Sequence, residues 1–280
     1  MDVLWSLLWI IILFSAMSPA VHQHYLQAAR QTLIRAWEKK RHSRLITLIH
    51  RQESVALWGL PIARYITMED SEAVLTAIRS TPPDTPIDLV LHTPGGLVLA
   101  AEQIARALYM HPSKTTVIIP HYAMSGGTLI ALAADQIIMD KHAVIGPLDP
   151  QINGLPAASI LQAVKDKGAQ NVDDQTLILA DISRKAIDQV KDTVKWFLKK
   201  HMDEEKAEEV ATLLCEGYYT HDNPIFAEEA KQLNLNIDTS MPKEIYDLLM
   251  LYPQPAGSQR SVSYSKNVEV PTDVSVIRYK

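Results

Sequence analysis

Apolar and polar positions alternate along this chain in blocks that predict a mainly parallel α/β fold. Short apolar runs have the composition of buried strands, at 45–50, 87–91, 116–119, 136–139 and 143–145. Segments with helical spacing of apolar residues lie between or after them, at 70–79, 99–110 and 128–134. The repeated order of strand, turn and helix favours right-handed crossovers and a parallel sheet.

The second half of the chain has a helical pattern. An apolar stripe over 174–201 predicts a long helix, and shorter helices are expected over 204–214 and 225–233, followed by a short strand at 235–237. The stretch from 146 to about 171 breaks the pattern and predicts a loop with a short helix. From 254 the chain is polar and contains prolines, which predicts a flexible tail over 254–280.

The N-terminus carries no charged residue from 3 to 20. About eighteen apolar residues suffice to cross a bilayer, so residues 1–22 are expected to form a transmembrane anchor. A buried helix or a cleaved signal peptide are the alternatives, although only Asp2 precedes the run and no basic segment does. Residues 23–44 predict a juxtamembrane amphipathic helix, and its basic residues place the rest of the chain in the cytoplasm.

Composition narrows the function classes. The formal net charge of -5 argues against a dedicated nucleic-acid-binding protein. The one cysteine, Cys215, excludes an internal disulfide framework and is interpreted as a small buried apolar residue. His22 and His24 lack a third ligand nearby, so no metal site is expected, and the absence of a dinucleotide fingerprint leaves no cofactor expected.

Two glycine turns, at 93–96 and 123–127, each follow a predicted strand and precede a predicted helix. Gly95, Gly96 and Gly126 allow close approach to backbone N–H groups, as an oxyanion hole requires. Ser125 lies at the apex of the second turn and is a candidate nucleophile. Its other interpretation, an ordinary helix N-cap, is equally compatible with the residues alone.

A serine nucleophile needs a base, and two kinds are present. The candidate histidines are His92, His121, His142, His201 and His221, none of which stands in a recognisable histidine–carboxylate pattern. Lys185 lies within the long predicted helix close to apolar residues, where burial would lower the pKa of a lysine. By composition alone, a salt bridge of Lys185 with Asp181 or Asp188 is the favoured interpretation.

Three motifs, at 87–102, 122–132 and 145–151, resemble the serine dehydrogenase proteinase family. These proteins are membrane-anchored relatives of signal peptide peptidase A within the Clp protease/crotonase superfamily, and the likeness covers about 45–253. The resemblance implies a spiral of ββα units that assembles into homo-oligomeric rings. It implies Ser125 as nucleophile and Gly95, Gly96 and Gly126 as oxyanion residues. A Ser–Lys dyad in these relatives, matched helix to helix, implies Lys185 as base. Alternative bases that stay open are Lys141, His142, Lys165 and Lys167.

The expected protein is therefore a membrane-anchored serine endopeptidase. Its peptidase domain would span 45–253 and would act on a peptide or membrane-protein substrate, with the lipid bilayer contacted through the N-terminal helix. Two rivals remain, a crotonase-type acyl-CoA enzyme and a catalytically inactive membrane-bound scaffold. Ser125 counts against the first, because crotonase-type enzymes use acidic residues with the same backbone oxyanion hole.

Overall fold

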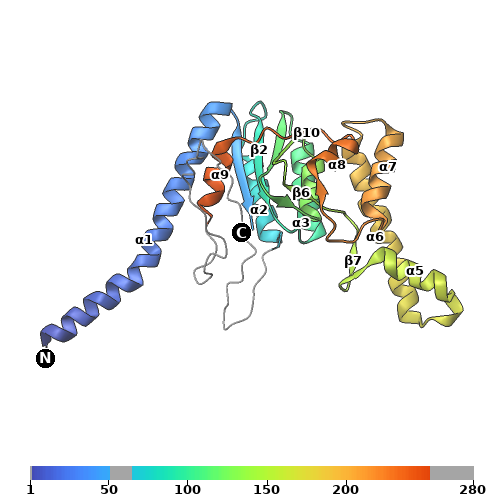
Figure 1. The fold of residues 1–280 in the computed structure, drawn as a ribbon, viewed down its shortest axis with the longest axis horizontal. Helices are drawn as coiled ribbons and strands as arrows, with labels where there is room; N and C mark the ends of the chain where they lie inside the picture. The colour runs from blue at the N-terminus through green and yellow to red at the C-terminus, as the bar shows by residue number, and fades with distance from the viewer. Residues whose placement is uncertain (1, 51–64, 253–280) are drawn as a thin grey trace, which may run out of the picture.

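A five-stranded parallel sheet forms the centre of the molecule (Figure 1). The computed structural model describes residues 2–50 and 65–252, with side chains from Val21 onward except that of His22. The strand order is β1 (Arg44–Ile49), β2 (Ile87–His92), β3 (Thr115–Ile119), β5 (Gln136–Met139) and β10 (Ile237–Asp238). Each neighbouring pair is parallel, which confirms the sheet expected from the apolar runs.

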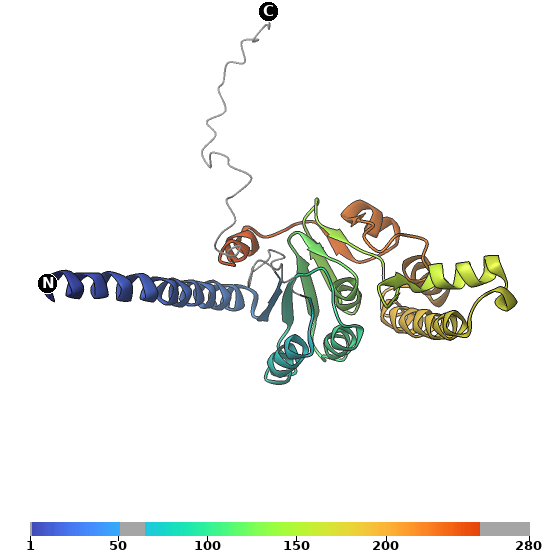
Figure 2. The same cartoon turned by 90° about the horizontal axis from the view of Figure 1, so that it is seen from below.

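Both faces of this sheet are covered, as its continuous apolar strands require. One face packs against α2 (Met68–Arg79), α3 (Val98–Tyr109) and α4 (Gly126–Leu132). The opposite face packs against the C-terminal half of α1 (Asp2–Arg41) and α9 (Lys243–Met250). Figure 2 shows α1 and α9 apart from the helices of the other layer. Alternate residues of each strand therefore point into two separate cores.

A second, smaller sheet follows the order β4 (Tyr122–Ala123), β6 (Val144–Ile145) and β9 (Ile225–Phe226). The turn that carries Ser125 therefore follows β4 and not β3 directly. β9 occupies the start of the segment expected to be helix 225–233, because Ile225 pairs with Ile145 across this sheet. The helix α8 is correspondingly shorter, Ala227–Gln232. A bridge between Thr93, the residue after β2, and Ala123 of β4 joins this sheet to the central one.

The remaining helices lie at the end of the molecule far from α1 (Figure 1). They are α5 (Ala157–Lys167), α6 (Asp174–Leu198) and α7 (Glu204–Cys215), with a hairpin of β7 (Gln151–Ile152) and β8 (Leu155–Pro156) before α5 and a short 3-10 helix, Ala169–Asn171, after it. α5 and the first half of α6 project from the body as an arm, visible at the lower right of Figure 1. The C-terminal half of α6 instead contributes Val194 and Phe197 to the main core.

A buried carboxylate fastens α1 to the sheet. Asp88 in β2 is almost fully buried and accepts hydrogen bonds from Trp37 Nε1 at 2.8 Å and Ser43 Oγ at 2.6 Å. It also accepts one from Arg41 Nε at 2.9 Å. Nearer the N-terminus of α1, the guanidinium of Arg30 donates to the carbonyl of Leu251 and lies over the ring of Tyr252. Much of the basic character of 23–44 therefore serves packing within the molecule.

Asp88→Ala is expected to lower the free energy of unfolding by about 3 kcal/mol, because it leaves a partly buried arginine and two buried donors without their acceptor. Urea denaturation of the full chain measures this change. The matched control is Lys40→Ala, which removes an exposed ion pair between α1 and Glu244 of α9 and is expected to cost about 0–1 kcal/mol. Equal effects of the two variants would contradict the role given to Asp88.

The apolar run expected to cross a membrane lies in the first half of α1, Asp2–Arg41. Among the residues described by the structure, no helix combines the length and hydropathy of a membrane span. The expected helix over 23–44 is present as the continuation of α1, and Leu26 and Trp37 on it are buried. The expected C-terminal tail, 254–280, lies outside the described residues.

Candidate active site

The two glycine turns lie side by side at the carboxyl ends of their strands. Thr93 and Ala123 form a parallel bridge, in which Thr93 N–H donates to the Tyr122 carbonyl at 3.2 Å. Met124 N–H donates in turn to the Thr93 carbonyl at 3.0 Å. Residues about thirty positions apart in sequence are thereby held in one small region, at the edge of a parallel sheet where open α/β folds bind ligands.

Ser125, the candidate nucleophile, is half-buried and has an unusual backbone conformation. Its φ of 49° and ψ of -119° place a non-glycine residue in a sparsely populated region, which costs about 1–3 kcal/mol. It precedes α4, yet its side chain makes no capping hydrogen bond to that helix. The Ser125 hydroxyl therefore does not act as a helix cap. Strain of this kind is concentrated at functional sites and needs support from the surrounding fold.

Two backbone amides beside Ser125 are available for an oxyanion. Within the described part of the chain, no acceptor is found for the N–H of Gly96 or of Gly126. The Gly96 nitrogen lies 3.6 Å from the point that a Gly126 Cβ would occupy, so the two residues are close neighbours. Gly95 differs, because its N–H donates to Thr93 Oγ1 at 3.2 Å. Of the three glycines expected from the sequence, Gly95 supports the turn and the other two offer donors.

Gly95 and Gly96 are required because other backbone segments, at Met124 and Ile66, lie very close to them. A Cβ on Gly96 would lie 2.3 Å from the Ile66 nitrogen, and one on Gly95 would lie 2.8 Å from the Met124 carbonyl oxygen. Ile66 pairs with this turn through two hydrogen bonds, Ile66 N–H to the Gly95 carbonyl and Leu97 N–H to the Ile66 carbonyl. No side chain fits between these segments.

Gly96→Ala is expected to displace the turn, to lower the free energy of unfolding by about 1–3 kcal/mol and to slow covalent modification of Ser125. Thermal unfolding and labelling with a fluorophosphonate measure the two effects. Gly154→Ala is the matched control, since Gly154 also has a positive φ of 79° but nothing lies within 4 Å of its Cβ position. That variant is expected to lose about 1–2 kcal/mol and to keep the labelling rate. Unchanged labelling of Gly96→Ala would contradict the oxyanion assignment.

Ser125 opens into a cavity of about 380 Å³. Its walls come from both glycine turns, the loop before β7, α6 and the loop between α7 and β9. The apolar side chains on these walls are those of Tyr65, Pro94, Leu97, Val98, Leu129, Leu148, Pro150 and Val190. The polar side chains, besides Ser125, are those of Asp149, Gln151 and His221. A mostly apolar cavity with a few convergent polar groups is typical of a substrate site.

His221 and Asp149 form a hydrogen-bonded pair in this cavity. His221 Nδ1 lies 2.7 Å from Asp149 Oδ1, and Asp149 is almost fully buried. Gln151 Nε2 donates to the other oxygen of Asp149 at 2.6 Å. The hydrogen bond with Asp149 holds the pKa of His221 above its ordinary value, against the effect of burial. A serine, a histidine and a buried carboxylate thus share one cavity, which is the composition of a catalytic triad.

Sequence reasoning named His221 as one of five candidate histidines but did not find its partner. Asp149 and His221 are 72 residues apart, and the fold alone brings them together. One signal was present in the sequence: Asp149 is the one acidic residue in the glycine- and proline-rich segment 146–151. An acidic residue in such a segment is a candidate functional group, although its partner has no fixed spacing.

Lys185 does not line the Ser125 cavity. Its side chain is 68% exposed and pairs with Asp181 at 2.5 Å, the salt bridge that composition favoured. Val190 of the same helix does face the cavity, and five helical residues correspond to a rotation of about 140°. Lys185 therefore points to another side of α6. The desolvated environment expected for a lysine base is absent at this position.

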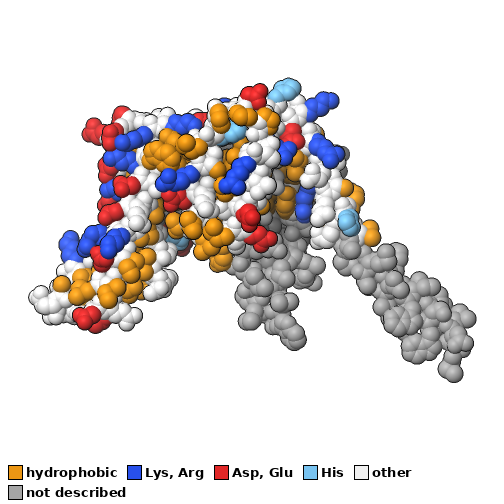
Figure 3. Space-filling view, turned by 180° about the vertical axis from the view of Figure 1, so that it is seen from behind, with side chains coloured by type: hydrophobic (Ala, Val, Ile, Leu, Met, Phe, Trp, Pro, Cys, Tyr) orange, Lys and Arg blue, Asp and Glu red, His pale blue; other side chains and the backbone are white. Residues whose placement is uncertain are grey.

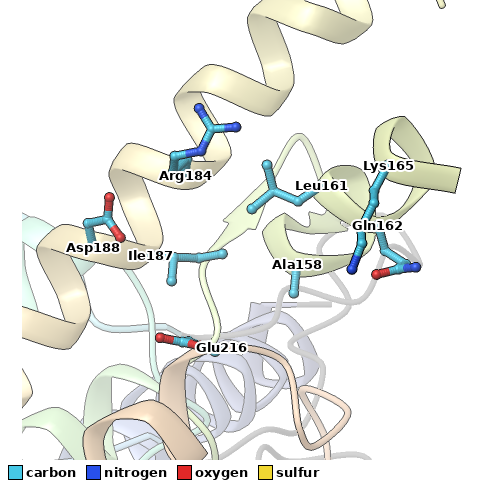
Figure 4. A pocket seen from close by; sticks show the side chains of 8 residues that line it. All are labelled: Ala158, Leu161, Gln162, Lys165, Arg184, Ile187, Asp188 and Glu216. Atoms are coloured by element: carbon cyan, nitrogen blue, oxygen red, sulfur yellow. The ribbon is translucent and has the colours of Figure 1, made fainter. Parts of the chain in front are cut away.

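The other alternative bases also lie elsewhere. Lys141 and His142 are exposed in the turn between β5 and β6, and neither lines the cavity. Lys165 lines a different cavity, of about 330 Å³, between α5 and α6 (Figure 4). Lys167 is exposed at the C-terminal end of α5. Of the residues expected from the motifs, the candidate nucleophile Ser125 lines the cavity, whereas the alternative bases do not.

The remaining candidate histidines and the cysteine do not line the Ser125 cavity in the described part of the chain. His92 is buried and stacks against His121 at 5.7 Å, while His201 contacts the Ala134 carbonyl. Burial raises the pKa of the Cys215 thiol to about 12. A thiol with that pKa is protonated at neutral pH, so Cys215 is no nucleophile, in agreement with its interpretation from sequence.

Comparison with known proteins gives a family for the whole chain. The model of a family described as ClpP-like SDH-type serine proteinase matches residues 1–275. Two uncharacterized proteins of Methanocaldococcus jannaschii are similar to this chain. One is 56% identical over 91% of this chain and 90% of its own length, and the other is 54% identical over 92% of this chain and 87% of its own length.

Proposed function

The chain belongs to the ClpP-like SDH-type serine proteinases, and from this premise we propose that it hydrolyses peptide bonds with Ser125, His221 and Asp149. The observation that carries the proposal is that these three residues line one cavity. In it, Ser125 has a strained backbone and no capping hydrogen bond, and His221 is hydrogen-bonded to the buried Asp149. Family membership supports a serine peptidase, and the geometry supports these three residues within it.

In the proposed mechanism, Nε2 of neutral His221 accepts the Ser125 proton as Oγ attacks the substrate carbonyl. Asp149 accepts a hydrogen bond from Nδ1–H, which fixes the tautomer and stabilises the imidazolium that forms. The N–H groups of Gly96 and Gly126 donate to the oxyanion of the tetrahedral intermediate. The imidazolium then protonates the leaving amine, and water attacks the acyl-enzyme with His221 again as base.

The Ser–Lys dyad expected from the family resemblance receives no support from the geometry. A lysine base needs burial or a neighbouring cation to be neutral near pH 7. Lys185 has an exposed side chain that pairs with Asp181, so neither of these conditions is found there. The His221–Asp149 pair needs no such desolvation, because a histidine titrates close to neutral pH.

Mass spectrometry tests the proposed nucleophile. The full chain is incubated with a fluorophosphonate and digested, and the modified peptide is sequenced. The proposal expects one adduct, on Ser125, together with release of product from unlabelled peptide substrates. An adduct on another serine, or absence of both adduct and hydrolysis, contradicts it; the second result would favour the inactive scaffold.

Membrane anchoring in the cytoplasmic orientation is part of the proposal. It is supported by the charge-free residues 3–20, which continue as one helix into the docked half of α1. The full chain is expected to sediment with membranes, and Leu8→Lys combined with Ile11→Lys is expected to release it, since each lysine at a helix centre opposes insertion by about 2.5–3.5 kcal/mol. A membrane fraction unchanged by both lysines would contradict anchoring by this run.

Assembly into homo-oligomers also remains a proposal. Exposed apolar side chains lie on the projecting arm, at Ile178 and Ile182, and on the hairpin before it, at Leu155. Hydrophobic side chains gather on this arm at the lower left of Figure 3. Apolar surface of this kind is typical of a protein interface.

A further inference from the structure

A buried histidine, His50, contacts the first glycine turn, residues 93–96, which is called the oxyanion turn below. His50 follows β1, and its N–H extends the strand pairing by donating to the His92 carbonyl at 2.7 Å. Its side chain is buried, and Nδ1 lies 2.9 Å from Thr93 Oγ1. His50 is not among the described residues that line the Ser125 cavity.

Thr93 connects the two turns that form the site. Its Oγ1 accepts the Gly95 N–H at 3.2 Å, and its backbone N–H and carbonyl pair with Tyr122 and Met124 of the serine turn. Its methyl group packs against the nucleophile helix, because Cγ2 lies 2.7 Å from the point that a Gly127 Cβ would occupy. The fully buried Thr93 therefore determines how the oxyanion turn sits relative to Ser125.

The other ring nitrogen of His50 reaches a second support of the same turn. Nε2 lies 3.4 Å from Asp70 Oδ2, and Asp70 forms the capping box of α2 with Thr67. Thr67 follows Ile66, the residue that pairs with both sides of Gly96. His50 thus contacts both Thr93, whose side chain binds the Gly95 N–H, and Asp70, which caps the helix that begins just after Ile66.

We propose that His50 is a positioning residue, which acts through Thr93 to keep the Gly96 N–H directed at the oxyanion formed on Ser125. This inference rests on the proposed function. A neutral Nδ1 accepts the Thr93 hydroxyl proton and leaves an Oγ1 lone pair for the Gly95 N–H. Loss of the contact frees the Thr93 hydroxyl to turn away from Gly95 and loosens the turn, and a displacement of about 1 Å at an active site costs on the order of 100-fold.

Three substitutions separate the contacts of His50 with Thr93 and with Asp70. Asn places a polar atom near the position of Nδ1 and retains the Thr93 contact, Gln places one near Nε2 and retains the Asp70 contact, and Ala removes both. His50→Ala and His50→Gln are expected to lower the maximal rate of inactivation by a fluorophosphonate about 10–100-fold. The concentration for half-maximal rate is expected to change less than about twofold, because the cavity wall is intact. His50→Asn is expected to recover most of the rate.

Thr93 provides a second pair of variants if the His50 variants fail to fold. Thr93→Val keeps the methyl packing but lacks Oγ1, and is expected to show the same loss of rate. Thr93→Ser keeps Oγ1 and is expected to retain the rate, and thermal unfolding checks that each variant is folded. Wild-type rates in Thr93→Val, or equal losses in His50→Asn and His50→Gln, overturn the positioning role. Ser125→Ala is measured alongside: if it still labels, the proposed function itself fails.

Discussion

Ser125→Ala is expected to lower peptide hydrolysis on the order of 10⁵-fold and to abolish labelling by a fluorophosphonate. The reason is the loss of the atom that forms the acyl-enzyme. The residual rate would come from the oxyanion donors and substrate binding, which remain in place. Substrate affinity is expected to be unchanged, because the serine side chain is a small part of a cavity of about 380 Å³. Initial rates and equilibrium binding of a peptide substrate measure the two quantities.

Ser159→Ala is the matched control, since Ser159 is an exposed serine in α5 outside the cavity. It is expected to keep both hydrolysis and labelling. Retention of hydrolysis by Ser125→Ala would remove Ser125 as nucleophile. Hydrolysis lost equally in both variants would indicate that the substitutions act on folding or assembly and not on chemistry.

The second large effect concerns Asp149. Asp149→Asn is expected to lower kcat/KM on the order of 10⁴-fold, because an amide fails to hold the His221 tautomer and to stabilise the imidazolium. It is also expected to shift the pH profile. Protonated His221 accepts no proton, so kcat/KM falls as pH drops through the pKa of His221. The hydrogen bond to Asp149 raises that pKa above 6.5; the wild-type midpoint is therefore expected above 6.5, and Asp149→Asn is expected to move it down.

The control for the pH profile is His142→Ala, because His142 is an exposed histidine outside the cavity. Its profile is expected to match that of the wild type. A midpoint that does not move in Asp149→Asn would contradict the pairing of His221 with Asp149. A midpoint that moves in His142→Ala would point to the histidine scheme left open by the sequence.

The sheet and the candidate nucleophile could be predicted because their signals are local. Each buried strand appears as an apolar run, and the glycines of both turns stand directly after two such runs. Parallel strands end at the same edge, which brings the turns together without further information. The sequence left Ser125 balanced between nucleophile and helix cap, and its positive φ and missing capping bond count against the cap.

The proposed base could not be predicted because its signals are not local. Asp149 and His221 come from loops 72 residues apart, and their contact depends on how α6 and α7 return to the sheet. Lys185 fitted the helical pattern, but apolar neighbours in sequence did not bury it. Its position about 140° around α6 from Val190 leaves its side chain 68% exposed. Helical periodicity identifies faces of a helix and does not say which face meets the site.

Two strands of the small sheet were not predicted from the sequence. β4 and β9 are each two residues long, too short for an apolar alternation to stand out, whereas β6 was expected as the apolar run 143–145. Their pairing nevertheless sets the position of Ser125, since β4 ends two residues before it. The same limit explains why the segment expected as one helix over 225–233 contains both a strand and a helix.

The rate of Ser125 labelling in His221→Ala, compared with Lys185→Ala in the same full-length protein, tests the central claim most directly. A fluorophosphonate reacts at a rate that depends on activation of the serine, so the identity of the base is read without a known substrate. The His221–Asp149 account predicts that His221→Ala loses nearly all labelling and that Lys185→Ala labels at the wild-type rate. Loss of labelling in Lys185→Ala with retention in His221→Ala would contradict it and restore the Ser–Lys dyad.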